Sequence, residues 1–81
     1  MENEDILSAL QKIFRSVLFN SSIVLDMKSD AASIEEWDSL THVELIYSIE
    51  QHFKIKFSSR EILSWKNIEQ MVQSIQLKKH N

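Results

Sequence analysis

Apolar residues recur at intervals of three and four positions in three stretches of the chain, residues 3–19, 39–53 and 68–77. This spacing places apolar side chains on one face of a helix and leaves the other face polar. The expected buried stripes are Ile6, Leu10, Ile13, Phe14 and Val17, then Leu45, Ile46, Ile49 and Phe53, then Ile68, Met71, Val72 and Ile75. Such helices bury their stripes against one another, so the pattern predicts an all-α fold.

The turns between these helices must form without glycine or proline, because the chain contains neither. Asn20-Ser21-Ser22 ends the first helix, and the next regular element begins only at Asp38, which leaves a long loop. Residues 33–36 have the form of a capping box and predict one helical turn within that loop. Four apolar residues are expected to attach the loop to the bundle: Ile23, Leu25, Ile34 and Trp37.

The segment after the second helix, residues 53–57, alternates apolar and basic side chains, which is typical of extended backbone. Ser58 or Ser59 is a suitable cap for a short helix over residues 60–63, and Asn67 is a suitable cap for the last helix. Residues 78–81 are expected to fray. The prediction is a four-helix bundle with a long loop between the first two helices and a short third helix.

A chain of 81 residues forms a single domain over residues 1–81, which buries only roughly 60–65% of its unfolded surface and leaves little room for a deep cleft. It has no cysteine and three histidines without close pairing, so no metal site is expected. The sequence shows no signal-peptide pattern and no apolar run approaching about 18 residues. We therefore expect a monomeric, cytoplasmic protein that does not associate with membranes.

The net charge of −3 is unevenly distributed along the chain. Residues 29–53 contain six acidic residues and no lysine or arginine, whereas residues 54–81 contain six basic residues and two acidic ones. The second helix thus lies in a negative region, which attracts basic partners and repels nucleic acid. Chance clustering of surface charges in a short chain is the alternative explanation.

The second helix begins at a serine that directly follows an aspartate. Asp38 is a good N-cap, because its carboxylate can accept hydrogen bonds from the first free N–H groups of the helix. Ser39 then becomes the first helical residue, and its hydroxyl lies at the positive end of the helix dipole. A phosphate attached there is stabilised by ~0.3–1 kcal/mol, so the site suits a phosphodiester.

Residues 37–57 resemble the acyl carrier protein family around its modification site. The resemblance lies in Asp-Ser-Leu at positions 38–40, in His-Val-Glu-Leu-Ile at positions 42–46, and in Ile49, Glu50 and Phe53. It implies that Ser39, flanked by Asp38 and Leu40, carries 4'-phosphopantetheine, and that the chain holds an acyl thioester without catalysing a reaction itself. A separate, magnesium-dependent phosphopantetheinyl transferase would attach the arm.

Two glycines that are common in this family are replaced here, which suggests a specialised, stand-alone member. Trp37 stands where glycine often precedes Asp-Ser-Leu. Lys54 stands where glycine often follows the end of the second helix, and a left-handed lysine there would cost roughly 1–2 kcal/mol. The resemblance implies service in a fatty-acid, polyketide or related pathway, with a peptidyl or aminoacyl carrier as the alternative.

The resemblance also implies that partner enzymes recognise the second helix. Helical spacing places Leu40, Val43 and Tyr47 on a face beside the buried stripe, with Glu44 next to them. Together with Glu50, these residues are expected to contact basic patches on acyl-loading and acyl-transfer enzymes. The competing interpretation is that the apolar members are only the edge of the core.

Two other functions are compatible with parts of the pattern. His42 lies three residues after Ser39 and suggests a catalytic serine, but a triad also needs a third group and an oxyanion hole from separate segments. We therefore expect no catalytic residues, and a solvent-exposed His42. The remaining alternative is an unmodified helical interaction module in which Asp38 and Ser39 only begin a helix.

Overall fold

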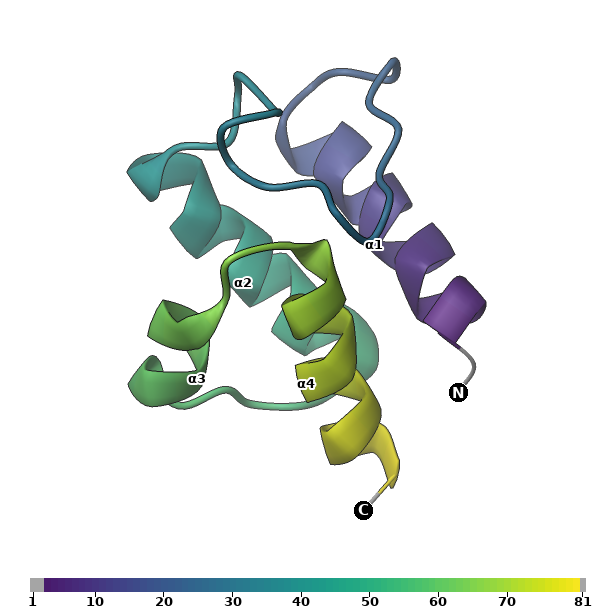
Figure 1. Ribbon diagram of the computed structural model, residues 1–81, viewed down its shortest axis with the longest axis vertical. Helices are drawn as coiled ribbons and strands as arrows, with labels where there is room; N and C mark the ends of the chain where they lie inside the picture. Colours follow the sequence, from purple (N-terminus) through teal and green to yellow (C-terminus); the bar gives the residue numbers. More distant parts are fainter. Residues whose placement is uncertain (1–2, 81) are drawn as a thin grey trace.

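The computed structural model describes residues 3–80, with side chains for residues 3–79. The helices are α1 (Asn3–Val17), α2 (Ser39–Phe53), α3 (Ser59–Ser64) and α4 (Ile68–His80). α1 packs against both α2 and α4, and the described residues contain no strand (Figure 1). This confirms the predicted all-α bundle with a long first loop and a short third helix.

The core lies where the buried faces of α1, α2 and α4 meet. The side chains without solvent exposure are Ile6, Leu10, Phe14, Leu45, Ile49, Ile68, Met71, Val72 and Ile75. They come almost entirely from the three predicted stripes, because only those positions face inward at helical spacing. α3 contributes no buried side chain, so the core of the bundle is built by the other three helices.

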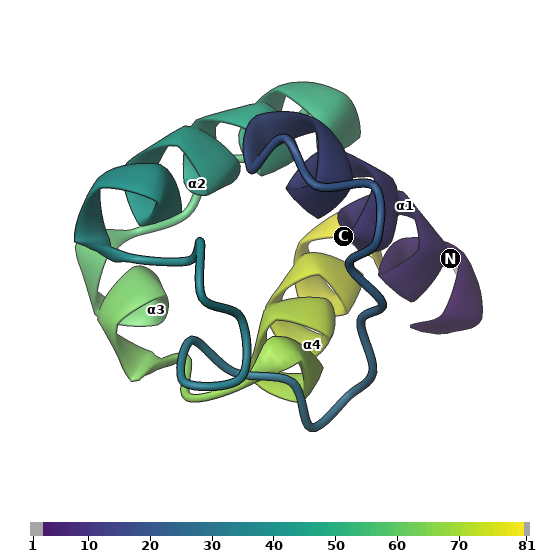
Figure 2. The same ribbon diagram turned by 90° about the horizontal axis from the view of Figure 1, so that it is seen from above.

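The loop over residues 18–38 passes over one end of the bundle (Figure 2). Its four predicted anchors, Ile23, Leu25, Ile34 and Trp37, are all buried. α1 fixes the loop from one side, because the Leu25 N–H donates to Gln11 Oε1 at 3.0 Å and Arg15 Nε donates to the Ile23 carbonyl at 2.6 Å.

The same loop also completes the start of α4. The Ile68 and Glu69 N–H groups, which have no partner inside their own helix, donate to the carbonyls of Ser29 and Met27 at 2.8 and 2.9 Å. The loop therefore supplies acceptors for the first N–H groups of α4. Reaching them from the end of α1 accounts for the length of the loop.

The turns of this loop are closed by side chains. The Asp26 N–H donates to Ser29 Oγ at 3.0 Å, and the Asp30 N–H donates to Ser33 Oγ at 3.1 Å. The predicted helical turn over residues 33–36 is wrong: Ser33 pairs backwards with Asp30, and residues 34–36 form only a turn. Asx and hydroxyl turns of this kind compete locally with a helix start.

Within the described residues, two take the left-handed conformation, Phe19 after α1 and Lys54 after α2. Lys54, with φ 59° and ψ 48°, adopts the left-handed conformation considered for it from the sequence, and its N–H donates to the Glu50 carbonyl. Phe19, with φ 53°, was not anticipated, because neither glycine nor asparagine marks the position. Each costs roughly 1–2 kcal/mol relative to ordinary backbone.

α4 continues to His80, and Asn81 lies outside the described residues. The fraying expected over residues 78–81 stays a prediction. Two contacts hold this last turn. Lys78 Nζ forms an ion pair with Glu61 at 3.0 Å, and Lys79 Nζ donates to the Phe53 carbonyl at 3.2 Å. Both contacts join residues far apart in sequence, so local pattern gave no sign of them.

α3 begins one residue earlier than predicted, at Ser59, with Ser58 as its cap. The Glu61 N–H donates to Ser58 Oγ at 3.2 Å and the Ser58 N–H donates to Glu61 Oε1 at 2.9 Å. The same Glu61 carboxylate pairs with Lys78, and the pKa of Glu61 is lowered, first by the N–H of its own capping box and then by that lysine. α3 is thus attached mainly through polar contacts.

Candidate functional site

The start of α2 is organised by a reciprocal hydrogen-bond pair between Asp38 and Thr41. Asp38 Oδ1 accepts from the N–H groups of Leu40 and Thr41, both at 2.9 Å. Thr41 Oγ1 accepts from the Asp38 N–H at 2.8 Å and donates to the Glu36 carbonyl, also at 2.8 Å. The predicted cap is confirmed, and Thr41 closes a capping box that usually uses glutamate or glutamine.

This geometry keeps Asp38 ionised. Hydrogen bonds from the Thr41 N–H, the Thr41 hydroxyl and the Leu40 N–H lower the pKa of the Asp38 carboxyl, and slight desolvation only partly opposes them. The negative charge is directed at the helix N–H groups, where it is favourable.

Ser39 is the first residue of α2 and is exposed to solvent. Within the described part of the chain its hydroxyl has no hydrogen-bond partner, because Asp38 and Thr41 already satisfy the capping positions. An exposed, unengaged hydroxyl at the positive end of a helix is accessible to an external enzyme. A serine used only for capping would have this oxygen bound to the backbone.

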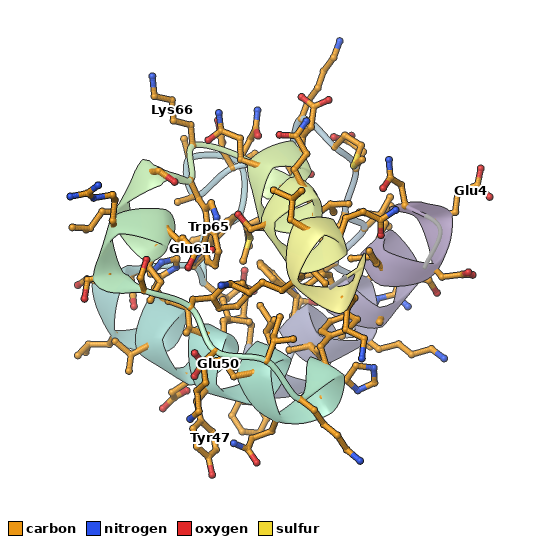
Figure 3. All side chains as sticks on the ribbon, turned by 90° about the horizontal axis from the view of Figure 1, so that it is seen from below. Glu4, Tyr47, Glu50, Glu61, Trp65 and Lys66 are labelled. Atoms are coloured by element: carbon orange, nitrogen blue, oxygen red, sulfur yellow. The ribbon has the colours of Figure 1, made fainter. Side chains whose placement is uncertain are left out.

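The outer face of α2 is apolar and open. Leu40 is 80% exposed, Val43 67% and Tyr47 63%, so none of them is an edge of the core. Glu44 lies exposed beside them, and Tyr47 extends away from the bundle (Figure 3). Exposed apolar rows are candidates for contact with other molecules.

Glu50 differs from the other residues of the predicted recognition face. It is partly buried, and its Oε2 accepts a hydrogen bond from the Phe57 N–H at 2.8 Å. Figure 3 shows it turned toward the segment that follows α2. Glu50 therefore fastens the extended segment that was predicted from the alternation at residues 53–57, in which Ile55 and Phe57 pack against the core.

His42 is not the solvent-exposed residue that the sequence suggested; it is partly buried in an aromatic cluster. Its Nδ1 accepts a hydrogen bond from Trp37 Nε1 at 2.9 Å, and the two rings stack with centroids 5.9 Å apart. The rings of His42 and Trp65 meet edge to face, with their centroids 6.4 Å apart. Burial lowers the pKa of His42, which favours the neutral imidazole.

This arrangement provides no catalytic machinery at Ser39. His42 Nδ1 is committed to Trp37, and no hydrogen bond joins the imidazole to the serine within residues 3–80. The described residues also contain no group of three potential metal-binding side chains. Sequence reasoning missed the His42 cluster because it needs Trp65, which reaches the site only through the fold.

A shallow hollow of about 330 Å³ lies beside Ser39. Its wall is drawn from the loop, the start of α2 and the connection between α3 and α4: Ala31, Trp37, Asp38, Ser39, His42, Trp65 and Lys66. The serine is thus at the rim of a partly aromatic depression. No helix within residues 3–80 has the length and apolar character needed to span a membrane.

The chain matches the family model described as "phosphopantetheine attachment site" over residues 8–75. No curated protein sequence matches it significantly. Among solved structures, it is similar to the solution NMR structure of a holo acyl carrier protein from Geobacter metallireducens, with 43% identity and a TM-score of 0.84. That similarity covers 89% of this chain and 83% of the other.

The family model spans most of the bundle, and the solved relative shares its fold at substantial identity. The site agrees with these matches, since it offers an accessible hydroxyl and no catalytic groups of its own. The chain therefore belongs to the phosphopantetheine-binding acyl carrier proteins, which are carriers without catalytic activity whose cofactor is covalently attached 4'-phosphopantetheine.

Proposed function

We propose that Ser39 is the attachment residue and that the chain carries acyl groups as thioesters on the arm joined to it. The observation that supports this most is the free, exposed hydroxyl at the first residue of α2. The helix dipole favours the phosphodiester that attachment would create there. Asp38 and Leu40 flank the serine, and both are exposed to an incoming transferase.

The outer face of α2 is our candidate for partner recognition. Leu40, Val43 and Tyr47 would supply apolar contact, and Glu44 would pair with basic patches on a phosphopantetheinyl transferase and on acyl-loading or acyl-transfer enzymes. Glu50 would add negative charge only, because one of its oxygens is engaged by Phe57. We expect these contacts to be transient, as suits a carrier that must leave each enzyme quickly.

The pathway is fatty-acid, polyketide or related biosynthesis, and we favour a specialised carrier. Gln51 and His52 make the second half of α2 less acidic than the housekeeping carriers of the family that the sequence resembles. We propose a cytoplasmic location, where coenzyme A is available to a transferase. We infer that the chain, a single domain over residues 1–81, acts as a monomer.

Intact-mass measurement tests the attachment residue. The purified protein is incubated with coenzyme A, Mg²⁺ and a broad-specificity phosphopantetheinyl transferase, alongside Ser39→Ala and Ser59→Ala. Ser59 is the matched control, since it is also the exposed first residue of a helix that follows a capping side chain. We expect one phosphopantetheinyl unit on the wild type and on Ser59→Ala, and none on Ser39→Ala.

Loading of Ser39→Ala would overturn the assignment. Failure of the wild type to load with transferases of different specificity would favour an unmodified interaction module. Circular dichroism of Ser39→Ala should match the wild type, because Asp38 and Thr41 form the cap without the serine.

A further inference from the structure

Phe19 combines two features that are unfavourable for a folded chain. Its side chain is 94% exposed, the largest value among the exposed apolar side chains of residues 3–79, and its backbone has φ 53°. A bulky residue with positive φ is an outlier, because its Cβ crowds the following carbonyl oxygen. Since the ring is exposed, packing inside the bundle does not compensate for this strain. Strained residues cluster at active sites, ligand clamps and switch regions, so Phe19 indicates a functional contact.

The backbone on both sides of Phe19 is fixed by hydrogen bonds to α1. The Leu18 N–H donates to the Phe14 carbonyl at 2.9 Å, and Leu18 itself is buried. The Asn20 N–H donates to the Arg15 carbonyl at 3.1 Å. A partner that covers the phenyl ring therefore does not have to order the backbone that carries it, which lowers the entropic cost of binding.

Hydrogen bonds also join this segment to the start of α2. Asn20 Nδ2 donates to Glu36 Oε2 at 2.7 Å, and Thr41 Oγ1 donates to the Glu36 carbonyl at 2.8 Å. In Figure 1 the end of α1 and the start of α2 lie at the same end of the bundle. An enzyme that binds at Ser39 therefore approaches the end of the molecule at which Phe19 is exposed.

The surface that follows Phe19 is apolar and acidic. A hollow of about 250 Å³ lies between the segments 20–24 and 33–36 of the loop. Val24 at its wall is 74% exposed, and Glu35 is also exposed. Among the described residues, the lining includes the carboxylates of Glu35 and Glu36 and no basic side chain. The hollow therefore suits a lysine or arginine side chain of a partner, next to an apolar pocket that takes the ring of Phe19.

We propose that Phe19, Val24 and Glu35 form a second contact area for the phosphopantetheinyl transferase, in addition to the outer face of α2. The transferase would offer an apolar pocket to Phe19 and a basic side chain to the hollow at Glu35. This inference rests on the proposed function, since it requires a transferase to act at Ser39. It extends recognition of the carrier from α2 to the end of α1.

The charge of this area favours a basic protein surface over two other occupants. The carboxylates at the hollow repel an anionic membrane surface. A second copy that presented its own acidic α2 face, with Glu44 exposed, would be repelled in the same way. A transferase that binds the acidic α2 face already needs a basic patch, and that patch can continue onto Glu35.

Steady-state loading kinetics test the proposal with the intact chain, coenzyme A and Mg²⁺. Phe19→Ala is compared with Leu77→Ala, because Leu77 is also exposed, at 69%, but lies beside Asn3 at the start of α1. We expect the KM for the carrier to rise about fivefold in Phe19→Ala, as for an aromatic contact at an interface. The kcat should stay unchanged, because the ring does not touch the reacting atoms. Leu77→Ala should change neither constant.

Glu35→Lys and Glu4→Lys test the charge of the contact area at equal net charge. Both glutamates are exposed, and Glu4, at the start of α1, extends away from the bundle (Figure 3). Glu35→Lys should raise KM more than Glu4→Lys, and the difference should shrink at high salt, which screens exposed charges. Equal effects of the two substitutions would remove Glu35 from the contact area.

Phe19→Gly separates a binding role from a structural one. Glycine adopts φ 53° without crowding by a Cβ, so the thermal midpoint should rise although KM rises as in Phe19→Ala. A lower midpoint together with an unchanged KM would assign Phe19 to the support of the fold and would overturn the inference.

The remaining outcomes separate this inference from the function on which it rests. A wild-type protein that loads at Ser39, with KM unchanged in Phe19→Ala for every transferase that loads it, would overturn the inference alone. A wild-type dimer in sedimentation that Phe19→Ala dissociates would make a second copy the occupant and would also overturn it. Binding to phosphatidylglycerol vesicles that Phe19→Ala abolishes would overturn it in favour of a membrane. A wild-type protein that never loads would overturn both proposals.

Discussion

The two ends of α2 are completed in opposite ways. At its start, Asp38 and Thr41 cap the helix with neighbouring side chains, and the backbone around Ser39 needs no distant partner. At its end, the Glu50 carbonyl accepts from Lys54 and Ile55, the Phe53 carbonyl accepts from Lys79, and the Glu50 carboxylate accepts from Phe57. The start of α2 is capped by neighbouring residues, and its end is held by residues from other segments.

This difference suits a carrier. A locally capped start leaves the outer surface around Ser39 clear for enzymes of different shape, since no other element must cover it. The end of α2 is bonded to α4 and to the extended segment, which keeps the helix in place while an enzyme binds at its start. Substitutions at the end of α2 should therefore change mainly the stability of the fold, and substitutions at its start should change mainly the surface around Ser39.

The largest effect is expected from Phe53→Ala at the tied end. Phe53 is 3% exposed, and truncating a buried phenylalanine typically costs about 3–5 kcal/mol of unfolding free energy. Urea denaturation followed by circular dichroism measures the change. Tyr47→Ala, on the exposed face of the same helix, is the control and should change the free energy of unfolding little. Equal losses in the two variants would show that the outer face also supports the fold.

Asp38→Ala at the start should have a smaller effect. It removes the acceptor of two N–H groups, so we expect the thermal midpoint to fall by a few degrees and α2 to fray at its first turn. Asp38→Asn keeps an acceptor and should recover most of the loss. A midpoint unchanged in Asp38→Ala would mean that Thr41 alone holds the start of the helix.

Lys54→Gly relieves strain at the tied end and should stabilise the fold. Glycine adopts φ 59° without the Cβ clash, which is worth about 1 kcal/mol after its greater freedom in the unfolded state is subtracted. Thermal unfolding should show a higher midpoint. Lys56→Gly, at a position without positive φ, should instead lower it. A lowered midpoint in Lys54→Gly would contradict the assignment of strain to this residue.

The smallest effect is a pH dependence at the start of the helix. Burial lowers the pKa of His42 below its ordinary value of 6.5, so the unfolded chain binds this proton more readily than the folded one. The associated stability is fully present above pH 6.5 and is lost as the pH falls through the folded-state pKa. Asp38, whose pKa is lowered within the carboxyl range, titrates at more acidic pH.

Urea unfolding of the wild type and of His42→Phe, at pH values on either side of 6.5, measures this contribution. Phenylalanine preserves a flat ring but does not titrate, so the loss of stability at lower pH should shrink in that variant. An identical pH profile for both proteins would show that the folded and unfolded chains bind this proton equally well, and it would contradict the lowered pKa of His42.

The parts of the fold predicted from the sequence are those with a local cause. The bounds of α2 were predicted correctly, because Asp38 caps it, its stripe has helical spacing and Lys54 ends it. Exposure of Leu40, Val43 and Tyr47 followed from the same periodicity, whereas the irregularly spaced loop anchors were expected to be buried because they are apolar. These features depend on residues a few positions apart, which sequence patterns describe well.

The parts that were missed depend on partners distant in sequence. The last turn of α4 contacts Glu61 and the Phe53 carbonyl, and neither partner follows from the local pattern. His42 was expected in solvent because its position on a helix gives no hint of Trp65. The left-handed Phe19 has no residue-type signal, and it lies at the end of α1 where the Asn20 N–H donates back to the Arg15 carbonyl at 3.1 Å.

The loop over residues 18–38 has a kinetic consequence. Its turns are closed by side-chain hydrogen bonds such as that between Asp30 and Ser33, and the chain has no proline in any turn. Slow folding phases of about 10–100 s at 25 °C usually arise from prolyl isomerisation, which cannot occur here. Refolding should therefore finish in one fast phase. Molecules that unfold would regain the shape of the attachment site without a slow-folding fraction.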